Sequence, residues 1–235
     1  MPEPLTVAVC QPGCVDLDVA ANAALHAEAV LRAEARLVVF PELSLTGYDL
    51  AAPAVAVDDP RLGVLVEACR RTGAMALVGA PLRSEDGREH IATLAVTGQG
   101  AAGTYAKMHL HGDEGIRFTP GEKPAVLEID GWRLGLAVCR DAAVPQHAAE
   151  TAALGIDAYV ASTLYGAGPE QSARRDGHMQ ERAAAHGVWV VLSTAAGSSG
   201  EYRETSGGSG MWAPDGTLVA QAGPEVGAVV TETLR

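Results

Sequence analysis

The sequence predicts an α/β fold in which two sheets are stacked and helices lie outside them. Apolar, strand-like runs alternate with helix-like segments along the chain, and each half has a strand–helix–strand unit followed by a hairpin-like stretch, near residues 92–107 and 210–231. The chain has 235 residues, 48% of them hydrophobic and 20% charged, with no Ser/Gly linker or Pro-rich tract. We therefore expect residues 1–235 to form a single domain with a large core.

The first half begins with a βαβ unit. Residues 5–10 (L-T-V-A-V-C) and 37–40 (L-V-V-F) are apolar runs typical of buried strands, and the alanine-rich residues 19–36 between them have helical spacing. A second helix over residues 61–72 and a third core strand over residues 75–81 are expected to follow. This order favours a sheet with parallel strands.

An antiparallel pair and a long loop complete the first half. Residues 90–97 and 100–106 predict two strands joined at Gly98-Gln99. Residues 111–121 then form a loop rich in charge and glycine, which contains Glu114. Long irregular segments in a compact domain are often functional, so this loop is a candidate part of a site.

The second half repeats the alternation. The turn Asp130-Gly131 separates its first two strands, and Pro145 begins a helix, because proline fits the first helical turn. The loop over residues 197–210 is Gly/Ser-rich and predicts a surface or site-covering segment, since strands resume directly after it. The remaining expected elements are strands at residues 125–129, 133–139, 157–161, 188–193, 211–213, 217–221 and 226–231, helices at 145–154 and 169–186, and a loop at 162–168. The last three strands are expected to form one antiparallel run.

Three chemically active side chains stand at the ends of predicted strands. Cys139 ends an apolar strand just ahead of a helix, Glu42 follows the strand 37–40, and Lys107 follows the strand 100–106. Each has an ordinary alternative: cysteine is often a small core residue, and a glutamate after a strand is often solvated. If the strands are adjacent, however, the three side chains converge at one rim, where open α/β sheets place reactive groups.

Composition and charge exclude several classes of function. The formal net charge of −12 argues against binding of nucleic acid or of an anionic membrane surface. Four cysteines in a chain of this length do not form a disulfide framework, and neither C-x3-C nor the pair His109 and His111 has further ligands at metal-binding spacing. The first residues lack a basic region followed by an apolar stretch, so no signal peptide is expected, and no apolar run can span a bilayer. We expect a soluble, cytoplasmic protein without metal or cofactor.

Three motifs in order give the chain a family resemblance. V-V-F-P-E-L-S-L-T-G-Y contains Glu42 and ends in Tyr48, Y-A-K-M-H-L contains Lys107, and G-L-A-V-C-R-D contains Cys139. With these motifs the chain resembles the nitrilase superfamily of carbon–nitrogen hydrolases, whose signature is a Glu–Lys–Cys triad. Glu114, in E-G-I-R-F-T-P-G, matches a further glutamate that many members carry. E-R-A and G-G-S-G-M-W-A-P-D-G extend the resemblance over nearly the whole chain.

The resemblance implies a fold and an assembly. The fold is a four-layer α-β-β-α sandwich, nitrilase-like, with two mixed sheets and helices outside. The helices pair two chains into a homodimer or a larger homo-oligomer. The substrate is a small amide or N-carbamoyl compound, hydrolysed with water and without cofactor or metal.

The chemistry of the residues is consistent with these roles. A cysteine near its ordinary pKa is only slightly ionised at neutral pH and needs a nearby base or positive charge. Glu42 can take the thiol proton and return it to the leaving amine, while the Lys107 ammonium and the backbone N–H of Arg140 stabilise the oxyanion. Cys139 is then the nucleophile that carries a thioester, and Glu114 orients Glu42 or the substrate amide.

Several alternatives stay open. Arg140 either lies in the pocket wall, where it favours a carboxylate-bearing substrate, or points outward into an ion pair. Tyr48, Ser162, Thr163 and Tyr165 are candidate substrate contacts. A nitrile hydrolase, an acyltransferase or a catalytically silent binding member has the same motifs. A Cys–His hydrolase or glutamine amidotransferase is disfavoured, because Val138 and Arg140 flank the cysteine where a nucleophile elbow favours glycine.

Overall fold

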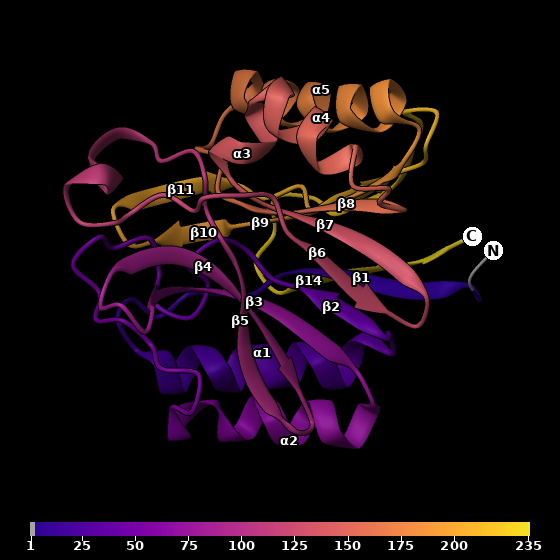
Figure 1. The fold of residues 1–235 in the computed structure, drawn as a ribbon. Coiled ribbons are helices and arrows are strands. Elements are labelled where there is room, and N and C mark those ends of the chain that lie inside the picture. The colour runs from indigo at the N-terminus through magenta and orange to yellow at the C-terminus, as the bar shows by residue number, and fades with distance from the viewer. Residues whose placement is uncertain (1–2) are drawn as a thin grey trace.

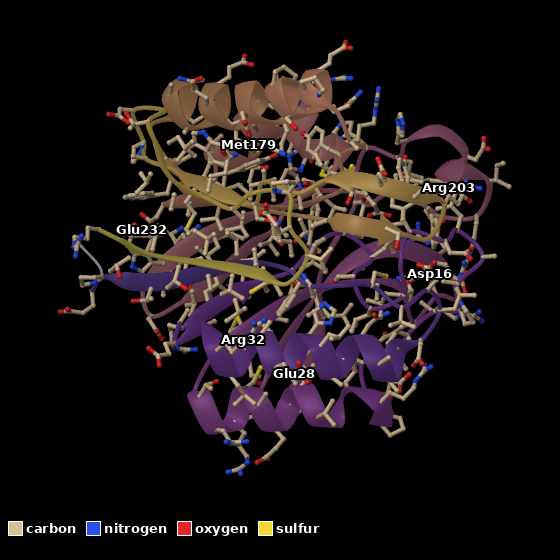
Figure 2. All side chains as sticks on the ribbon, turned by 180° about the vertical axis from the view of Figure 1, so that it is seen from behind. Asp16, Glu28, Arg32, Met179, Arg203 and Glu232 are labelled. Carbon is tan, nitrogen blue, oxygen red and sulfur yellow. The ribbon has the colours of Figure 1, made fainter. Side chains whose placement is uncertain are left out.

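The computed structural model describes residues 3–235, which form four layers (Figure 1). Two six-stranded sheets face each other in the middle. Helices α1 (Val19–Ala33) and α2 (Gly63–Thr72) cover the outer face of one sheet, and α4 (Pro145–Ala152) and α5 (Pro169–His186) cover the other. In Figure 2, Met179 of α5 and Glu28 of α1 accordingly lie on opposite sides of the sandwich. The predicted α-β-β-α architecture is confirmed.

The two sheets have the same internal plan, with three parallel strands at the centre and antiparallel strands at the flanks. In spatial order, the first sheet contains β14 (Ala228–Leu234), β1 (Leu5–Gln11), β2 (Leu37–Val39), β3 (Met75–Arg83), β4 (Glu89–Thr97) and β5 (Gly100–Ala106). The second contains β13 (Leu218–Gln221), β12 (Gly210–Trp212), β9 (Trp189–Thr194), β8 (Ala158–Thr163), β7 (Trp132–Val138) and β6 (Val126–Ile129). The likeness between the two halves that the sequence indicated is therefore real.

Burial on both faces explains the continuous apolar runs of the central strands. Leu37 and Val39 of β2 pack into the core between the two sheets, while Val38 packs against α1 and α2. Likewise Val138 faces the inter-sheet core, and Ala137 faces the layer of α4 and α5. Because successive strand residues point to opposite faces, a strand covered on both sides has no polar alternation.

Several sequence-based elements differ from the structure. Helix α1 ends at Ala33 rather than at residue 36, and β8 continues through Thr163, so the loop predicted from residue 162 begins after it. The predicted loop 197–210 contains the hairpin β10 (Ala196–Ser199) and β11 (Tyr202–Ser206).

The last strand, β14, leaves the predicted antiparallel run and pairs with β1 in the other sheet. The pattern of apolar residues predicts a strand there, but pairing partners depend on which sheet edge is free, and this is a tertiary property. Three short helices were not predicted: η1 (Pro60–Leu62), η2 (Gly112–Ile116) and α3 (Arg140–Ala143). They are too short to show a helical period.

Candidate active site

The structure brings the four predicted catalytic residues together between the two sheets. Glu42 and Lys107 follow β2 and β5 of the first sheet, Cys139 follows β7 of the second, and Glu114 comes from η2. Lys107 Nζ donates to Glu42 Oε1 and to Glu114 Oε1, each at 2.7 Å, and all three side chains are 0% exposed. The convergence expected from the strand ends is therefore present.

The backbone on either side of Glu42 is held against the first sheet. Leu43 adopts a positive φ of 51°, and the amide of Leu45 donates to the carbonyl of Gly79 in β3 at 3.0 Å. A Cβ at Gly79 would lie 2.9 Å from the carbonyl carbon of Glu42, so only glycine allows this approach. The close packing fixes the direction in which the glutamate points.

Lys107 is held by its backbone on both sides. Its N–H donates to the carbonyl of Ile91, and its carbonyl accepts from the N–H of Gly121, both at 2.8 Å. The first bond continues the pairing of β5 with β4, and the second ties the end of the loop 111–121 to the lysine. The ammonium therefore reaches the two glutamates from a fixed backbone.

Glu114 is fully hydrogen-bonded. Its Oε1 accepts from Lys107 and from the hydroxyl of Tyr48, and its Oε2 accepts from the backbone N–H of His111 at 2.7 Å. In contrast, Glu42 Oε2 is buried without a hydrogen-bond partner among residues 3–235. The free oxygen belongs to the carboxylate beside Cys139, and this arrangement leaves Glu42 able to accept a proton.

Cys139 lies on a strained turn between β7 and α3. Its φ of 47° and ψ of −101° are unusual for a residue with a side chain, and such strain is concentrated at functional positions. Its N–H donates to the carbonyl of Ser162 at 2.9 Å, and its thiol donates to the carbonyl of Leu164 at 3.5 Å. The turn forms without flanking glycines, although the sequence suggested that an elbow favours them.

The charges of the cluster shift the pKa of each partner. Desolvation raises the pKa of Glu42, and the charge of Glu114 adds to this, although Lys107 opposes it. Desolvation and the Glu42 carboxylate raise the pKa of the Cys139 thiol to about 12. Burial works against the charge of Lys107, but Glu42, Cys139 and Glu114 outweigh it and raise the lysine pKa. The resting state at neutral pH therefore has a protonated thiol, a cationic lysine and a glutamate of raised basicity.

A cavity of about 280 Å³ opens above the thiol. Its aromatic wall consists of Tyr48, Tyr165 and Tyr202, the last of which comes from the hairpin β10–β11. The rings of Tyr48 and Tyr202 meet edge to face, with centroids 5.2 Å apart. The predicted site-covering role of the Gly/Ser-rich segment thus applies to this hairpin, which supplies one wall.

The predicted substrate contacts separate into two groups. Tyr48, Tyr165 and Arg140 line the cavity, so Arg140 lies in the wall and not in an outward ion pair. Ser162 and Thr163 lie in β8, are buried and do not line the cavity. They are strand residues rather than loop residues, because β8 continues two residues further than the sequence indicated.

Sequence reasoning missed one whole face of the cavity. Gln171, Arg174 and His178 of α5 line it. They are spaced i, i+3 and i+7, which places them on one helix face, and this spacing was the available signal. His111 also lines the cavity, and Arg140 Nη1 contacts its Nδ1 at 3.4 Å.

A buried polar network behind the thiol was also missed. Asp141, fully buried, accepts from the Tyr105 hydroxyl at 2.7 Å, from the N–H of Val138 at 3.1 Å and from the N–H of His109 at 2.8 Å. Since His109 follows Lys107 by two residues, Asp141 ties the lysine segment to the cysteine turn. His147 continues the network by contacting the hydroxyl of Tyr105 at 2.8 Å.

No group of three side chains that could hold a metal is found among residues 3–235. His109 Nδ1 instead contacts Asp141 Oδ1 at 2.9 Å. None of the helices described in residues 3–235 has the length and hydropathy of a membrane span.

Comparisons with known proteins show the family and the fold. The family model described as carbon-nitrogen hydrolase matches residues 6–235. A hydrolase in the pqqF 5' region of Pseudomonas protegens is 31% identical over 223 residues, which cover 91% of this chain and 77% of that protein. An (R)-stereoselective amidase of Pseudomonas sp. is 28% identical over 203 residues, covering 85% of this chain and 73% of that protein.

Solved structures of one amidase, from Nesterenkonia sp. AN1, superpose on nearly the whole chain. A mutant in complex with butyramide has a TM-score of 0.85 and 26% identity, over 98% of this chain and 90% of that chain. Another mutant, with the same TM-score, identity and coverage, shows covalent addition of the acetamide moiety of fluoroacetamide at the active site cysteine.

Proposed function

The chain belongs to the carbon–nitrogen hydrolase family and is a hydrolase of that class, and on this premise we propose that it cleaves small amides through a thioester on Cys139. One observation carries the proposal: a lysine held by two buried glutamates lies beside a cysteine at the floor of a small cavity. Amides or N-carbamoyl compounds are the proposed substrates, with Glu42, Lys107 and Cys139 as catalytic residues and Glu114 beside them.

The first half-reaction forms the thioester. Since the pKa of the resting thiol is raised to about 12, the thiolate forms only as Glu42 takes its proton during attack on the carbonyl carbon. A carbon–sulfur bond forms and the carbonyl π electrons move to oxygen. Glu42 then gives its proton to the nitrogen, the carbon–nitrogen bond breaks, and ammonia leaves from a primary amide.

The oxyanion is stabilised by two donors. Lys107 is cationic at neutral pH because its neighbours raise its pKa. The N–H of Arg140 is the first of α3, where amide groups have no partner inside the helix. By analogy with other oxyanion sites, removing one such donor costs about 3 kcal/mol of transition-state stabilisation.

The second half-reaction consumes water. Glu42 takes a proton from a water molecule that attacks the thioester carbon, and the carbon–sulfur bond breaks to release the carboxylic acid. Cys139 leaves as a thiol when Glu42 returns the proton. Glu114 takes no part in proton transfer in this scheme, because its oxygens are occupied by Lys107, Tyr48 and His111.

The test is ammonia release from aliphatic amides, N-carbamoyl amino acids and nitriles by wild-type protein and by Cys139→Ala. We expect turnover of amides or N-carbamoyl compounds that disappears in the variant. Turnover confined to nitriles, or acyl transfer to an added amine in place of hydrolysis, would support the corresponding alternative activity. Turnover that persists in Cys139→Ala would refute the proposed nucleophile.

The cytoplasmic location and the homodimer or larger homo-oligomer stay predictions from the sequence and its resemblance. Gel filtration with light scattering would measure the assembly state directly.

A further inference from the structure

The cavity above Cys139 has a basic wall in a strongly acidic protein. Two arginines line it from different elements, Arg140 from α3 and Arg174 from α5, while the chain as a whole has a formal net charge of −12. Among the described residues that line the cavity, none is acidic. The excess of positive charge is therefore local to the place where the substrate binds.

These two arginines have no counter-ion within residues 3–235, whereas their neighbours on α5 do. Arg175 Nε lies 2.8 Å from Asp176 Oδ1, and Arg182 Nη1 lies 3.1 Å from Glu181 Oε2. Arg174 forms no such ion pair, and the side chain of Arg140 contacts His111 Nδ1 at 3.4 Å rather than a carboxylate. A single unpaired arginine on a surface is ordinary, but here two of them face one cavity.

The histidine of the α5 wall adds no positive charge to that of the two arginines. His178 touches the hydroxyl of Tyr165 at 3.3 Å, and its pKa is lowered by partial burial and by the charges of Arg174 and Arg182. Glu181, the acidic group that opposes this shift, is paired with Arg182. His178 is thus uncharged at neutral pH, and the positive charge of the wall comes from the guanidinium groups.

We propose that the substrate is a small amide that carries one carboxylate, which Arg140 and Arg174 bind while the amide carbon meets Cys139. The inference rests on the proposed amide hydrolysis and specifies its substrate class. Guanidinium groups bind carboxylates through paired N–H donors, and such charge-assisted bonds are stronger than neutral ones. A carboxylate can stand on the acyl side, as in a monoamide of a dicarboxylic acid, or on the amine side, as in an N-carbamoyl amino acid.

Pairs of compounds that differ only in the charge test this inference. Succinamate is compared with 4-methylpentanamide, and N-carbamoyl-β-alanine with 3-methylbutylurea, because an isopropyl group replaces the carboxylate in each second compound. We expect kcat/KM for at least one acid to exceed that of its neutral partner by about tenfold or more, and the pair that shows the preference identifies the side of the carboxylate. The preference should shrink as ionic strength rises.

Variants assign the preference to the arginines. Arg174→Gln and Arg140→Gln should each lower the acid-to-neutral ratio of kcat/KM by about tenfold, and Arg174→Lys should keep only part of it, because an ammonium retains the charge but not the paired donors. Arg71→Gln is the matched control, since Arg71 is an exposed arginine on α2, beneath the other sheet. Arg174 is itself exposed on the helix, so its exchange should leave the fold intact.

The outcomes separate the two proposals. If neither the acids nor the neutral compounds are hydrolysed, the proposed function is overturned. Hydrolysis in which the neutral compounds are preferred, or a ratio that both glutamine variants leave unchanged, would overturn the carboxylate inference while the amidase proposal stands.

Discussion

Replacing Lys107 by methionine should destabilise the protein strongly, because the lysine is the single cation between two buried carboxylates. Its Nζ lies 2.7 Å from both Glu42 Oε1 and Glu114 Oε1, and all three side chains are fully buried. Methionine keeps the apolar length of the side chain but leaves two like charges buried next to each other. The effect should therefore come from charge and not from a cavity.

The expected size follows from the geometry. Removing one partner of a buried ion pair costs about 3–5 kcal/mol of unfolding free energy. For a domain of this length each kcal/mol lowers Tm by about 2–4 °C, so Tm should fall by roughly 6–20 °C. Lys123→Met is the matched control, since Lys123 is the other lysine of the chain and is exposed. It should change the unfolding free energy by less than about 0.5 kcal/mol.

The pH dependence has a defined sign. The pKa of Lys107 is raised in the folded protein, so its stabilisation is complete below the ordinary lysine pKa of about 10.4 and is lost only as pH rises through the raised value. The pKa of Glu42 is also raised, so the folded state binds the proton of this carboxyl more tightly than the unfolded state does. Its contribution to stability therefore falls as pH rises from 4.5 through the folded pKa. Without the lysine this pKa rises further. The deficit of Lys107→Met should therefore be smaller at pH 5 than at pH 8.

Urea unfolding of both variants at pH 5 and pH 8 measures these differences. A loss below about 1 kcal/mol at pH 8, or a loss that is larger at pH 5 than at pH 8, would refute the interpretation of the cluster as a buried charge network.

Three further predictions concern the supports of the site. Gly79→Ala should lower the free energy of unfolding by about 1–3 kcal/mol and nearly abolish turnover, because the added Cβ displaces Glu42. The control Gly177→Ala, which has open space on α5, should leave stability unchanged or slightly raised. Equal effects of the two variants in thermal unfolding would contradict this. Asp141→Asn should lower kcat more than it raises KM, because the asparagine side chain cannot accept all the hydrogen bonds that hold the cysteine turn to the lysine segment. A loss of stability with kcat unchanged would show a merely structural role. The pH profile of kcat/KM should lose activity on the acid side at a pH above the ordinary glutamate pKa of 4.5, because Glu42 must be ionised to act and its pKa is raised; an acid limb at or below 4.5 would exclude it as the base.

The sequence predicted the central part of the fold because its strands are buried on both faces. Runs such as L-V-V-F have no polar alternation, and such runs alternating with helices indicate parallel strands under helical layers. The place of β14 was not predictable in this way, because its pairing with β1 depends on which edge of the first sheet is free.

The convergence of Glu42, Lys107 and Cys139 could be predicted from the sequence, because each residue lies at the end of a predicted strand. The basic wall could not be predicted, because Arg174 and His178 lie within a helix that has polar residues on several faces, and which of these faces lies over the cysteine depends on how the helix packs. Ser162 and Thr163 were misplaced for a related reason: polar residues at the end of β8 look like the start of a loop, although the sheet pairs them with Ser193 and Thr194. Local pattern identifies elements better than their ends.

The most direct test of the central claim is to trap the acyl-enzyme. Protein quenched in acid during steady turnover of an amide is digested, and the peptides that contain Cys10 with Cys14, Cys69 and Cys139 are weighed by mass spectrometry. We expect the Cys139 peptide alone to gain the mass of the acyl group, and hydroxylamine to remove it as the hydroxamate. An acyl group on another cysteine, or turnover in which neither an acylated Cys139 peptide nor a hydroxamate is found, would contradict the thioester mechanism.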